Sequence, residues 1–401
     1  MARVNRKPEI VIRNLGKEDM MAVSEKVLNQ FKTKFGGEPD FLVRAPGRVN
    51  LIGEHTDYND GFVLPMAIDR AAWIAFHRKG DKRVKVFSLD YEEMAEFELD
   101  DMQKGKGWAE YLKGVAHELN IAGFQVEGWE GVLGGDVPKG AGLSSSAAVE
   151  LATARAFAVL SGLDWDPAQM AQIGQRAENR WVGVNCGIMD QMVSAAAKAG
   201  HALFLDCRSL DYEHVPLPAG VAVVVMDTST RRGLVDSAYN QRRAQCEAAA
   251  AFFNVPALRD VSLDRFEEEK RKMKDELVMR RARHIVSENQ RVLDAVSAMH
   301  TGDVQELGRL FNESHASLRD DFEVTNEALN QIVEVAQAHP ACFGARMTGA
   351  GFGGCAVALV DEGKVGAFVT AVEAGYRQRS GLEAQMYVCQ ASNGASLIGE
   401  Y

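Results

Sequence analysis

The sequence has little that would suit a disulfide-bonded or membrane-spanning protein. Its six cysteines are scattered through 401 residues without a CxxC pair. This excludes a disulfide framework and a zinc site of the usual spacing, and it predicts reduced, mostly buried thiols. No run of about 18 apolar residues occurs, and the N-terminal segment "MARVNRKPEIVIRN" lacks the unbroken apolar core of a signal peptide. We therefore expect a cytoplasmic protein with no membrane partner.

Positive charge is also in short supply. The chain has 45 Lys and Arg against 56 Asp and Glu, a net charge of -11. Such a protein repels a phosphate backbone, so nucleic acid is excluded as an expected partner. Any anion that it binds must be held by local dipoles and a few well-placed cations.

The length and the 46% hydrophobic content predict two domains, because a single core stops growing near roughly 250–300 residues. Repeats and low-complexity tracts do not occur. The order of elements places the boundary near residue 218, giving domains 1–218 and 219–401. The stretch 267–284 carries acidic and basic residues at helical spacing, which is typical of a solvated helix face.

The first half has an antiparallel β pattern followed by helices. The predicted strands are 41–45, 62–68, 71–77, 83–89, 128–138 and 201–207, the predicted helices are 107–120, 144–160, 166–181 and 190–200, and 208–220 is rich in turn formers. The second half has strands at 221–227, 344–348, 355–360 and 383–390, with helices at 233–338 and 364–378. This order resembles a ferredoxin-like βαββαβ unit with extra helices after its first strand, so the fold class is α+β.

One segment near the start, "RAPGRVNLIGEHTDYNDG" (44–61), holds an unusual density of chemistry. Two arginines, several acids, a histidine and a tyrosine surround a single apolar patch, Val49 to Ile52. Ordinary strands alternate apolar with polar positions, and ordinary loops carry fewer distinct groups. The segment therefore predicts a ligand contact.

A second segment, "VPKGAGLSSSAAVELA" (137–152), brings glycines and three serines directly to a helix start. The unpaired N–H groups and partial positive charge of a helix start suit an anion such as phosphate. It is no Walker A loop, since no GK[ST] follows the glycines. A serine-rich helix cap without a ligand remains an alternative.

A third segment, "MTGAGFGGCAVALV" (347–360), contains GxGxxG at Gly349, Gly351 and Gly354. A dinucleotide-binding fold would need a helix after it, whereas an apolar β run follows, so this fold is excluded. Glycines between two strands permit either a close approach of backbone to a ligand or a tight hairpin.

Together the three segments resemble the GHMP small-molecule kinases, named for galactokinase, homoserine kinase, mevalonate kinase and phosphomevalonate kinase. "GRVNLIGEHTDYN" is similar to the galactokinase signature, and the similarity continues through "GLSSSA", "CGIMDQM", "LDCRSL", "YNQRRAQCE" and "GARMTGAGFGGCAVAL". It covers roughly residues 41–392. The resemblance implies an N-terminal domain like the second domain of ribosomal protein S5 and a ferredoxin-like C-terminal domain, whose last strand returns to the first domain.

The resemblance also implies an activity: ATP-dependent phosphorylation of the anomeric hydroxyl of galactose. Asp190 is the implied catalytic carboxylate and Arg48 the cation that steadies it, because phosphoryl transfer needs in-line positioning and charge neutralisation. Ser146 and Glu178 are the implied ligands of Mg²⁺, a cation that prefers oxygen ligands and keeps several waters.

Two pockets follow from the same resemblance. The implied sugar-binding residues are Glu54, His55, Thr56, Asp57, Gly187, Asp190 and Tyr239. The implied nucleotide-binding residues are Ser88 and Trp108 near the adenine, and Gly140, Ala141, Gly142, Leu143, Ser144, Ser145 and Ser146 around the phosphates. Glycines 349–354 would buttress the phosphate loop from the second domain, in a cleft between the domains, and we expect a monomer.

The chain departs from the family pattern at three places. "TNEALN" follows "SLRDDFEV", Ala391 stands where proline is usual, and Glu110 stands where asparagine is frequent. These differences bear on nucleotide preference or local stability. Two alternatives to a galactokinase stay open: a 1-kinase for N-acetylgalactosamine, L-arabinose or galacturonate, and a galactose sensor without turnover. The intact "GLSSSAA" favours an enzyme. Anomer preference, kinetic constants, feedback regulation and the timing of proton transfer to Asp190 are not predicted.

Overall fold

In this computed structural model the described chain comprises residues 17–230 and 235–401. It contains both helices and strands. The helices are α1 Lys17–Phe35, α2 Ala109–Ile121, α3 Ser145–Ser161, α4 Pro167–Arg176, α5 Met189–Ala196, α6 Val235–Phe252, α7 Leu263–Glu269, α8 Glu276–Thr301, α9 Val304–Asp320, α10 Glu327–Gln337 and α11 Val365–Ser380. The strands are β1 Phe41–Asn50, β2 Phe62–Val63, β3 Pro65–Arg78, β4 Arg83–Ser88, β5 Glu93–Glu98, β6 Trp129–Gly135, β7 His201–Asp206, β8 Tyr212–Pro216, β9 Val221–Asp227, β10 Cys342–Thr348, β11 Cys355–Asp361, β12 Gln385–Cys389 and β13 Ser396–Glu400.

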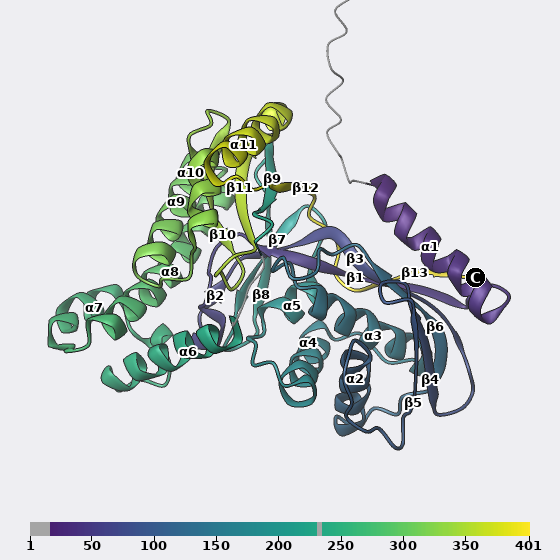
Figure 1. The fold of residues 1–401 in the computed structure, drawn as a ribbon. Coiled ribbons are helices and arrows are strands. Elements are labelled where there is room, and N and C mark those ends of the chain that lie inside the picture. Colours follow the sequence, from purple (N-terminus) through teal and green to yellow (C-terminus); the bar gives the residue numbers. More distant parts are fainter. Residues whose placement is uncertain (1–16, 231–234) are drawn as a thin grey trace, which may run out of the picture.

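A six-stranded sheet in the order β13-β1-β3-β6-β4-β5 forms the frame of the first half. Its neighbours are antiparallel except β4 and β6, which are parallel. Helix α1 lies along one side of this sheet and α2 to α5 gather on the other (Figure 1). Strands β2, β7 and β8 form a small separate sheet.

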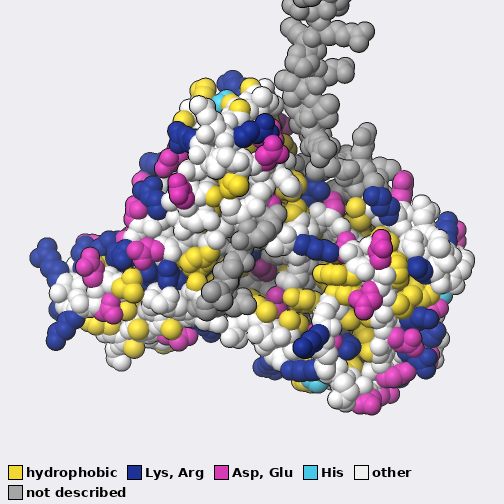
Figure 2. All heavy atoms as spheres, in the orientation of Figure 1, with side chains coloured by type: hydrophobic (Ala, Val, Ile, Leu, Met, Phe, Trp, Pro, Cys, Tyr) yellow, Lys and Arg dark blue, Asp and Glu magenta, His cyan; other side chains and the backbone are white. Residues whose placement is uncertain are grey.

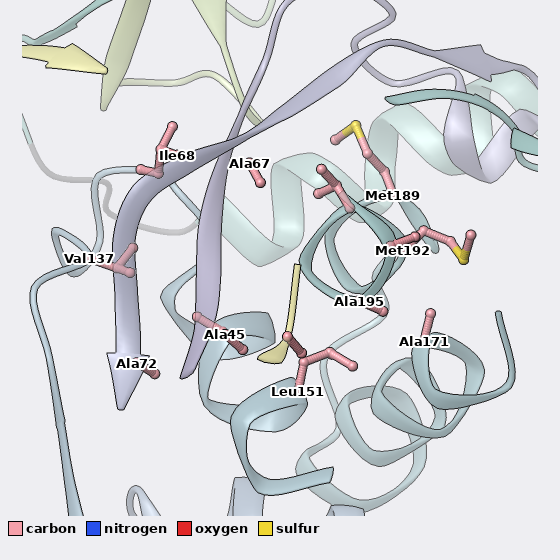
Figure 3. Close-up of a cluster of buried hydrophobic side chains, with 14 of the residues drawn as sticks. Ala45, Ala67, Ile68, Ala72, Val137, Leu151, Ala171, Met189, Met192 and Ala195 are labelled. Atoms are coloured by element: carbon pink, nitrogen blue, oxygen red, sulfur yellow. The ribbon is translucent and has the colours of Figure 1, made fainter. Parts of the chain in front are cut away.

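Burial on both faces explains why β3 has no polar alternation. Because side chains of a strand point alternately to opposite faces, Trp73 and Ala75 pack with Phe31 of α1, whereas Ile74 and Phe76 belong to the main core. Figure 3 shows part of that core, with side chains from β1, β3, α3, α4 and α5 around one centre. The small alanines of these elements allow α3 and α5 to lie close to the sheet.

The second sheet has the order β10-β11-β9-β12, and all its neighbours are antiparallel. With α6 to α10 between its first two strands along the chain and α11 between its last two, this is the ferredoxin-like topology that the sequence predicts. The predicted α+β fold class is thereby confirmed. The domain boundary near 218 falls between β8 and β9 and stays a prediction.

The strand β13 crosses back to the first sheet and pairs with β1, from Phe41↔Glu400 to Arg44↔Ser396. The last strand identified from sequence, 383–390, instead stays in the second sheet as β12. The return to the first domain is therefore made by a strand that the sequence pattern did not reveal.

Several predicted boundaries differ from the structure. The runs 62–68 and 71–77 become the short β2 and one continuous β3, which Pro65 can begin because the first residue of a strand needs no ladder donor. The turn-rich stretch 208–220 contains β8. The predicted helix 166–181 ends as an α-helix at Arg176 and continues as a π-helical turn, η2 Ala177–Val182.

The charged stretch 267–284 is not one solvated helix. Helix α7 ends at Glu269 and α8 begins at Glu276, after Asp275 caps its first turn. Charged side chains of both signs do cover the surface around α7 (Figure 2). Arg281 and His284, however, are 1% and 0% exposed. Arg281 packs against α6 and the segment after α9, where it donates to Gln245 and Glu323, whereas His284 contacts the carbonyl oxygen of Glu54 in the first half of the chain.

None of the helices in residues 17–230 and 235–401 combines the length and the apolar content needed to cross a membrane. All six cysteines lie within these ranges as free thiols.

Helix α9 and strand β10 touch through a pair of glycines, so we expect Gly344→Ala to destabilise the protein. A Cβ on Gly344 would lie 2.2 Å from the carbonyl oxygen of Gly308. Overpacking of this kind costs about 1–3 kcal/mol, to be measured as a lower midpoint of urea unfolding at an unchanged slope. Gly363→Ala is the control, since its Cβ would meet its nearest atom at an ordinary 3.4 Å. Equal stability of the two variants would contradict the prediction.

Candidate active site

A cavity of about 490 Å³ opens where the three glycine-rich segments meet. Its walls include Arg48 from the first segment, Gly142 from the second, Gly349 from the third and Tyr239 from α6. Since both halves of the chain contribute, the cavity lies between them, which is a common place for ligand pockets.

The structure brings most of the predicted site residues to this cavity. Those lining it are Arg48, Glu54, His55, Asp57, Gly140, Gly142, Leu143, Ser144, Ser145, Ser146, Glu178, Gly187, Asp190 and Tyr239. Ser88 and Trp108 line a second cavity of about 170 Å³, which Ser145 and Ser146 share with the first. Thr56 and Ala141 line neither, because both are fully buried.

The centre of the cavity is an ion pair between Arg48 on β1 and Asp190 in the first turn of α5. The guanidinium donates from Nε and Nη2 to the two carboxylate oxygens at 2.7 Å each, and from Nη1 to the carbonyl oxygen of Gly142 at 2.5 Å. Burial opposes the charge of Arg48, but the charges of Asp190 and Glu54 outweigh it and raise the pKa of the guanidinium. The hydroxyl of Ser144 donates to the same carboxylate.

The phosphate-loop candidate, 140–146, is shaped by residues in left-handed backbone conformations. Gly140, Gly142 and Ser144 have φ of 67°, 80° and 59°. Because Ser144 turns its hydroxyl to Asp190, no side chain within the described ranges caps the start of α3. The first N–H groups of this 17-residue helix are thus left for an anion.

The loop lies directly on β1. Gly47 permits this contact, since a Cβ there would lie 2.6 Å from the carbonyl oxygen of Leu143. The N–H of the next residue, Arg48, donates to that same oxygen at 3.1 Å. Loop and arginine therefore keep a fixed relation to each other.

The predicted metal ligands Ser146 and Glu178 meet at one end of the cavity, where the hydroxyl of Ser146 hydrogen-bonds to the carboxylate. Gln191 donates to Glu178 Oε2 at 2.8 Å. Burial and the nearby charge of Asp190 raise the pKa of Glu178. Close by, Glu150 is fully buried with Oε1 unpartnered among the described residues, and burial and Glu178 raise its pKa well above the ordinary value.

This excess of negative charge suits a cation. In the described part of the chain, no group of three or more His, Cys, Asp or Glu side chains could hold a metal alone. A carboxylate and a hydroxyl leave most positions to water and substrate oxygens, which is the coordination that Mg²⁺ prefers.

The predicted sugar-binding residues, apart from Thr56, line the same cavity. Burial and the charge of Asp190 raise the pKa of Asp57 to about 7. Its carboxylate rests on the backbone at Gly187, where a Cβ would lie 1.8 Å from Oδ2. His55 accepts or donates at Nδ1 to the hydroxyl of Tyr58 at 2.9 Å, and its ring packs on that of Tyr239. Thr56 instead donates its hydroxyl to carbonyl oxygens within the turn.

Glu54 belongs to the first segment, 44–61, which we call the sugar segment, and links it to the third segment, 347–360. Its Oε2 accepts from Asn50 at 2.8 Å and its Oε1 from the N–H of Gly349 at 2.8 Å. Gly349 lines the cavity, whereas Gly351 allows close approach to Val324, whose carbonyl oxygen would lie 2.1 Å from a Cβ. The two explanations offered by the sequence, ligand contact and tight packing, thus apply to different glycines of one loop.

Helix α8 holds the sugar segment from behind, a role that sequence reasoning missed. Glu288 accepts from the N–H of Gly53 at 3.0 Å, and Asn289 accepts from the N–H of Phe62 at 2.9 Å. Burial opposes ionisation of Glu288, but Arg291 and other cations outweigh it and lower its pKa to about 2. The only sequence signal for this role was that Glu288 and Asn289 are polar residues within an amphipathic helix.

The buried Arg346 of β10 completes this support. Its Nη1 donates to the carbonyl oxygen of Leu51 at 2.8 Å and lies 3.5 Å from Glu54 Oε1. Because Arg346 is 0% exposed, it fixes the sugar segment without being available to a ligand.

Tyr91 is a further residue that the sequence did not reveal. In the second cavity its ring is parallel to that of Trp108, with centroids 6.3 Å apart. Two parallel aromatic faces beside the buried hydroxyl of Ser88 suit a planar heteroaromatic ring. Its position three residues after Ser88 was the only sequence signal.

Comparisons with known proteins agree with this geometry. Family models match for the galactokinase galactose-binding signature at residues 29–78, for the N-terminal domain of GHMP kinases at 110–198 and for their C-terminal domain at 295–378. A galactokinase of Roseiflexus sp. (strain RS-1) is 46% identical over 375 residues, covering 92% of this chain and 96% of the relative.

Solved structures give the same result. The galactokinase of Lactococcus lactis, solved in complex with galactose, has a TM-score of 0.89 at 38% identity and covers 92% of this chain and 98% of its own. The mevalonate kinase of Methanococcus jannaschii shares the fold, with a TM-score of 0.65 at 16% identity over 88% of this chain and 99% of its own. The chain therefore belongs to the galactokinase family, a family of sugar kinases within the GHMP kinases.

Proposed function

We propose that this protein transfers the γ-phosphoryl group of ATP to the anomeric hydroxyl of galactose, giving α-galactose 1-phosphate and ADP. The observation that carries the proposal is the Arg48–Asp190 pair, which lines one cavity together with Asp57 and with Ser145 at the start of α3. A sugar hydroxyl bound beside Asp190 would thus lie near a phosphate bound at the start of α3, as phosphoryl transfer requires.

Asp190 orients the anomeric hydroxyl and accepts its proton at a carboxylate oxygen. The bidentate contact with Arg48 fixes this carboxylate in direction. Since an anomeric hydroxyl is more acidic than an ordinary alcohol, a carboxylate is an adequate acceptor. Arg48 also places positive charge where the transferring phosphoryl group would develop negative charge.

The remaining residues bind and orient the substrates. Asp57, Glu54, His55, Gly187 and Tyr239 form the sugar pocket, and Thr56 supports it by fixing the turn.

The loop from Gly140 to Ser146 binds the phosphates, where Ala141 acts through its buried packing. Ser88 and Trp108 hold the base. Ser146 and Glu178 would hold Mg²⁺, which when bound neutralises phosphate charge.

Two other functions remain distinguishable by experiment. A kinase for N-acetylgalactosamine, L-arabinose or galacturonate would use the same mechanism with another sugar. A sensor would bind both ligands without turnover. The enzyme is favoured because Ser144, at the phosphate loop, contacts Asp190 directly, an arrangement that serves catalysis and is not needed for binding.

We expect Asp190→Asn to abolish turnover while leaving the fold intact. Loss of the ionised carboxylate removes the proton acceptor and the partner of Arg48, which should lower kcat by about 10²- to 10³-fold or more. An ADP-release assay with Mg-ATP and galactose, glucose, N-acetylgalactosamine, L-arabinose and galacturonate measures this and identifies the sugar. The exposed Asp164→Asn is the matched control. Wild-type protein that binds both ligands but releases no ADP would favour the sensor.

Glu178→Gln should raise the Mg²⁺ concentration needed for half-maximal activity by about tenfold, since one charged ligand is lost. Burial makes the charge of Glu178 unfavourable in the folded protein, so the neutral variant should be no less stable in thermal unfolding. Galactose affinity without nucleotide should stay within about twofold. A variant with an unaltered Mg²⁺ requirement would show that Glu178 is not a ligand.

Galactose affinity should depend on pH through Asp57. Sugar hydroxyls donate to the ionised carboxylate, and because the pKa of Asp57 in the free protein is about 7, binding is full above this pH and weakens below it. The Kd from calorimetry without nucleotide should rise about tenfold between pH 8 and pH 6. Asp57→Asn should bind weakly with no such slope. A flat wild-type profile would contradict the assignment.

A further inference from the structure

Helix α2 begins with a buried carboxylate that no step of the proposed mechanism uses. Glu110 is the second residue of this helix, two positions after Trp108, and is 7% exposed. Its Oε2 accepts from the backbone N–H of Gly105 and from Nε1 of Trp181, both at 2.9 Å. Its Oε1 accepts from Lys113 Nζ at 2.8 Å. All the bonds of this side chain thus go to protein groups.

The donors belong to the two parts of the site that would hold a nucleotide and its metal. Gly105 lies in the loop that leads into Trp108, one wall of the second cavity. Trp181 lies in the π-helical turn η2, three residues after Glu178, the proposed metal ligand. Glu110 is therefore a direct bridge between the base pocket and the turn that carries the metal ligand.

Close packing makes this bridge stiff. A Cβ on Gly114 of α2 would lie 3.1 Å from Cβ of Trp181, so helix and turn are already in tight contact. Lys104 of the loop donates to the carbonyl oxygen of Arg180 at 2.8 Å. Burial opposes ionisation of Glu110, but the bonds from Gly105, Lys113 and Trp181 outweigh it and lower its pKa.

A side-chain acceptor is needed here because both partners across the bridge are donors. The N–H of Gly105 and Nε1–H of Trp181 donate to the same oxygen, Oε2, whereas Oε1 accepts from Lys113 of the same helix. A glutamine could keep the bridge by placing its amide oxygen at the Oε2 position, but an alanine has no acceptor. Both bridging donors would then be left unpaired in a buried place, which is costly. π-helical turns occur often at functional sites, and η2 presents Glu178 to the cavity.

We propose that Glu110 is a positioning residue that keeps the loop before Trp108 and the turn η2 in a fixed mutual arrangement, so that affinity for metal-bound nucleotide depends on it and affinity for sugar does not. The inference rests on the proposed function, since it takes Trp108 and Glu178 as nucleotide and metal contacts. The sugar pocket is independent of this bridge because α8 and Arg346 support it from the other half of the chain.

The test compares Glu110→Ala with the wild type by calorimetry of Mg-ATP without sugar and of galactose without nucleotide. Loss of both hydrogen bonds of the bridge should weaken Mg-ATP binding about 5- to 10-fold, with a similar rise in KM for Mg-ATP. The Kd for galactose and the kcat at saturating Mg-ATP should stay within about twofold. A merely structural role would lower the affinities for both ligands together, and would overturn the proposal.

Glu118→Ala is the matched control. Glu118 also lies on α2, is 1% exposed, and bonds Arg176 at 3.0 Å just before η2, but it does not reach the loop before Trp108. Its variant should keep the wild-type affinity for Mg-ATP. An equal loss in both variants would show that any tether between α2 and α4 suffices, and would overturn the specific role of Glu110.

Trp181→Phe keeps the test decisive if Glu110→Ala does not fold. Phenylalanine retains an aromatic ring and removes the indole N–H that donates to Glu110. The same 5- to 10-fold loss of Mg-ATP affinity, without loss of galactose affinity, supports the proposal, and an unchanged affinity overturns it. If the wild type itself fails to bind Mg-ATP, the proposed function fails. If the wild type binds Mg-ATP and the variants bind it with the same affinity, only the present inference fails.

Discussion

Negative charge in excess of positive charge is the constraint on which the site depends. Asp57, Glu178 and Asp190 line a cavity, with Glu150 buried near Glu178, and among the described residues that line it Arg48 is the one cationic side chain. Burial leaves this imbalance unscreened, so the pKa values of Asp57, Glu150 and Glu178 rise and the pocket favours partners that donate hydrogen bonds or carry positive charge. Sugar hydroxyls are such donors, and a divalent cation is such a charge. The same electrostatics would select both substrates.

Supporting contacts from the second half of the chain make this cavity rigid. After β1 the regular structure of the sugar segment is one short 3₁₀ helix, η1 Asp57–Asn59. Glu288 and Asn289 of α8 accept hydrogen bonds from the backbone N–H groups of Gly53 within the segment and Phe62 directly after it. Arg346 of β10 and Gly349, the residue that follows β10, reach the same segment. Because the pKa of Glu288 is lowered to about 2, this acceptor stays ionised at neutral pH, and its support of the segment does not change with physiological pH.

Sequence reasoning succeeded where local chemistry is continuous and failed where the partner is remote. The signature around Arg48 to Asp57 and the serines before α3 could be located because each role depends on neighbouring residues. The ferredoxin-like order followed from strand and helix spacing. Strand β13 escaped because its partner β1 lies near the other end of the chain, where Leu42 pairs with Gly399 and Arg44 with Ser396. The π-helical turn η2 escaped because a single wider turn leaves the helical periodicity almost unchanged.

The return of β13 to the first sheet has a consequence for how the protein is made. The ribosome releases β13 only after every strand of the second sheet, so β1 remains an unpaired edge during most of synthesis. The first sheet can therefore be completed only when the second half of the chain has emerged. Folding of the two sheets is coupled in time, and a nascent chain interrupted before β13 would present an adhesive strand edge that chaperones must shield.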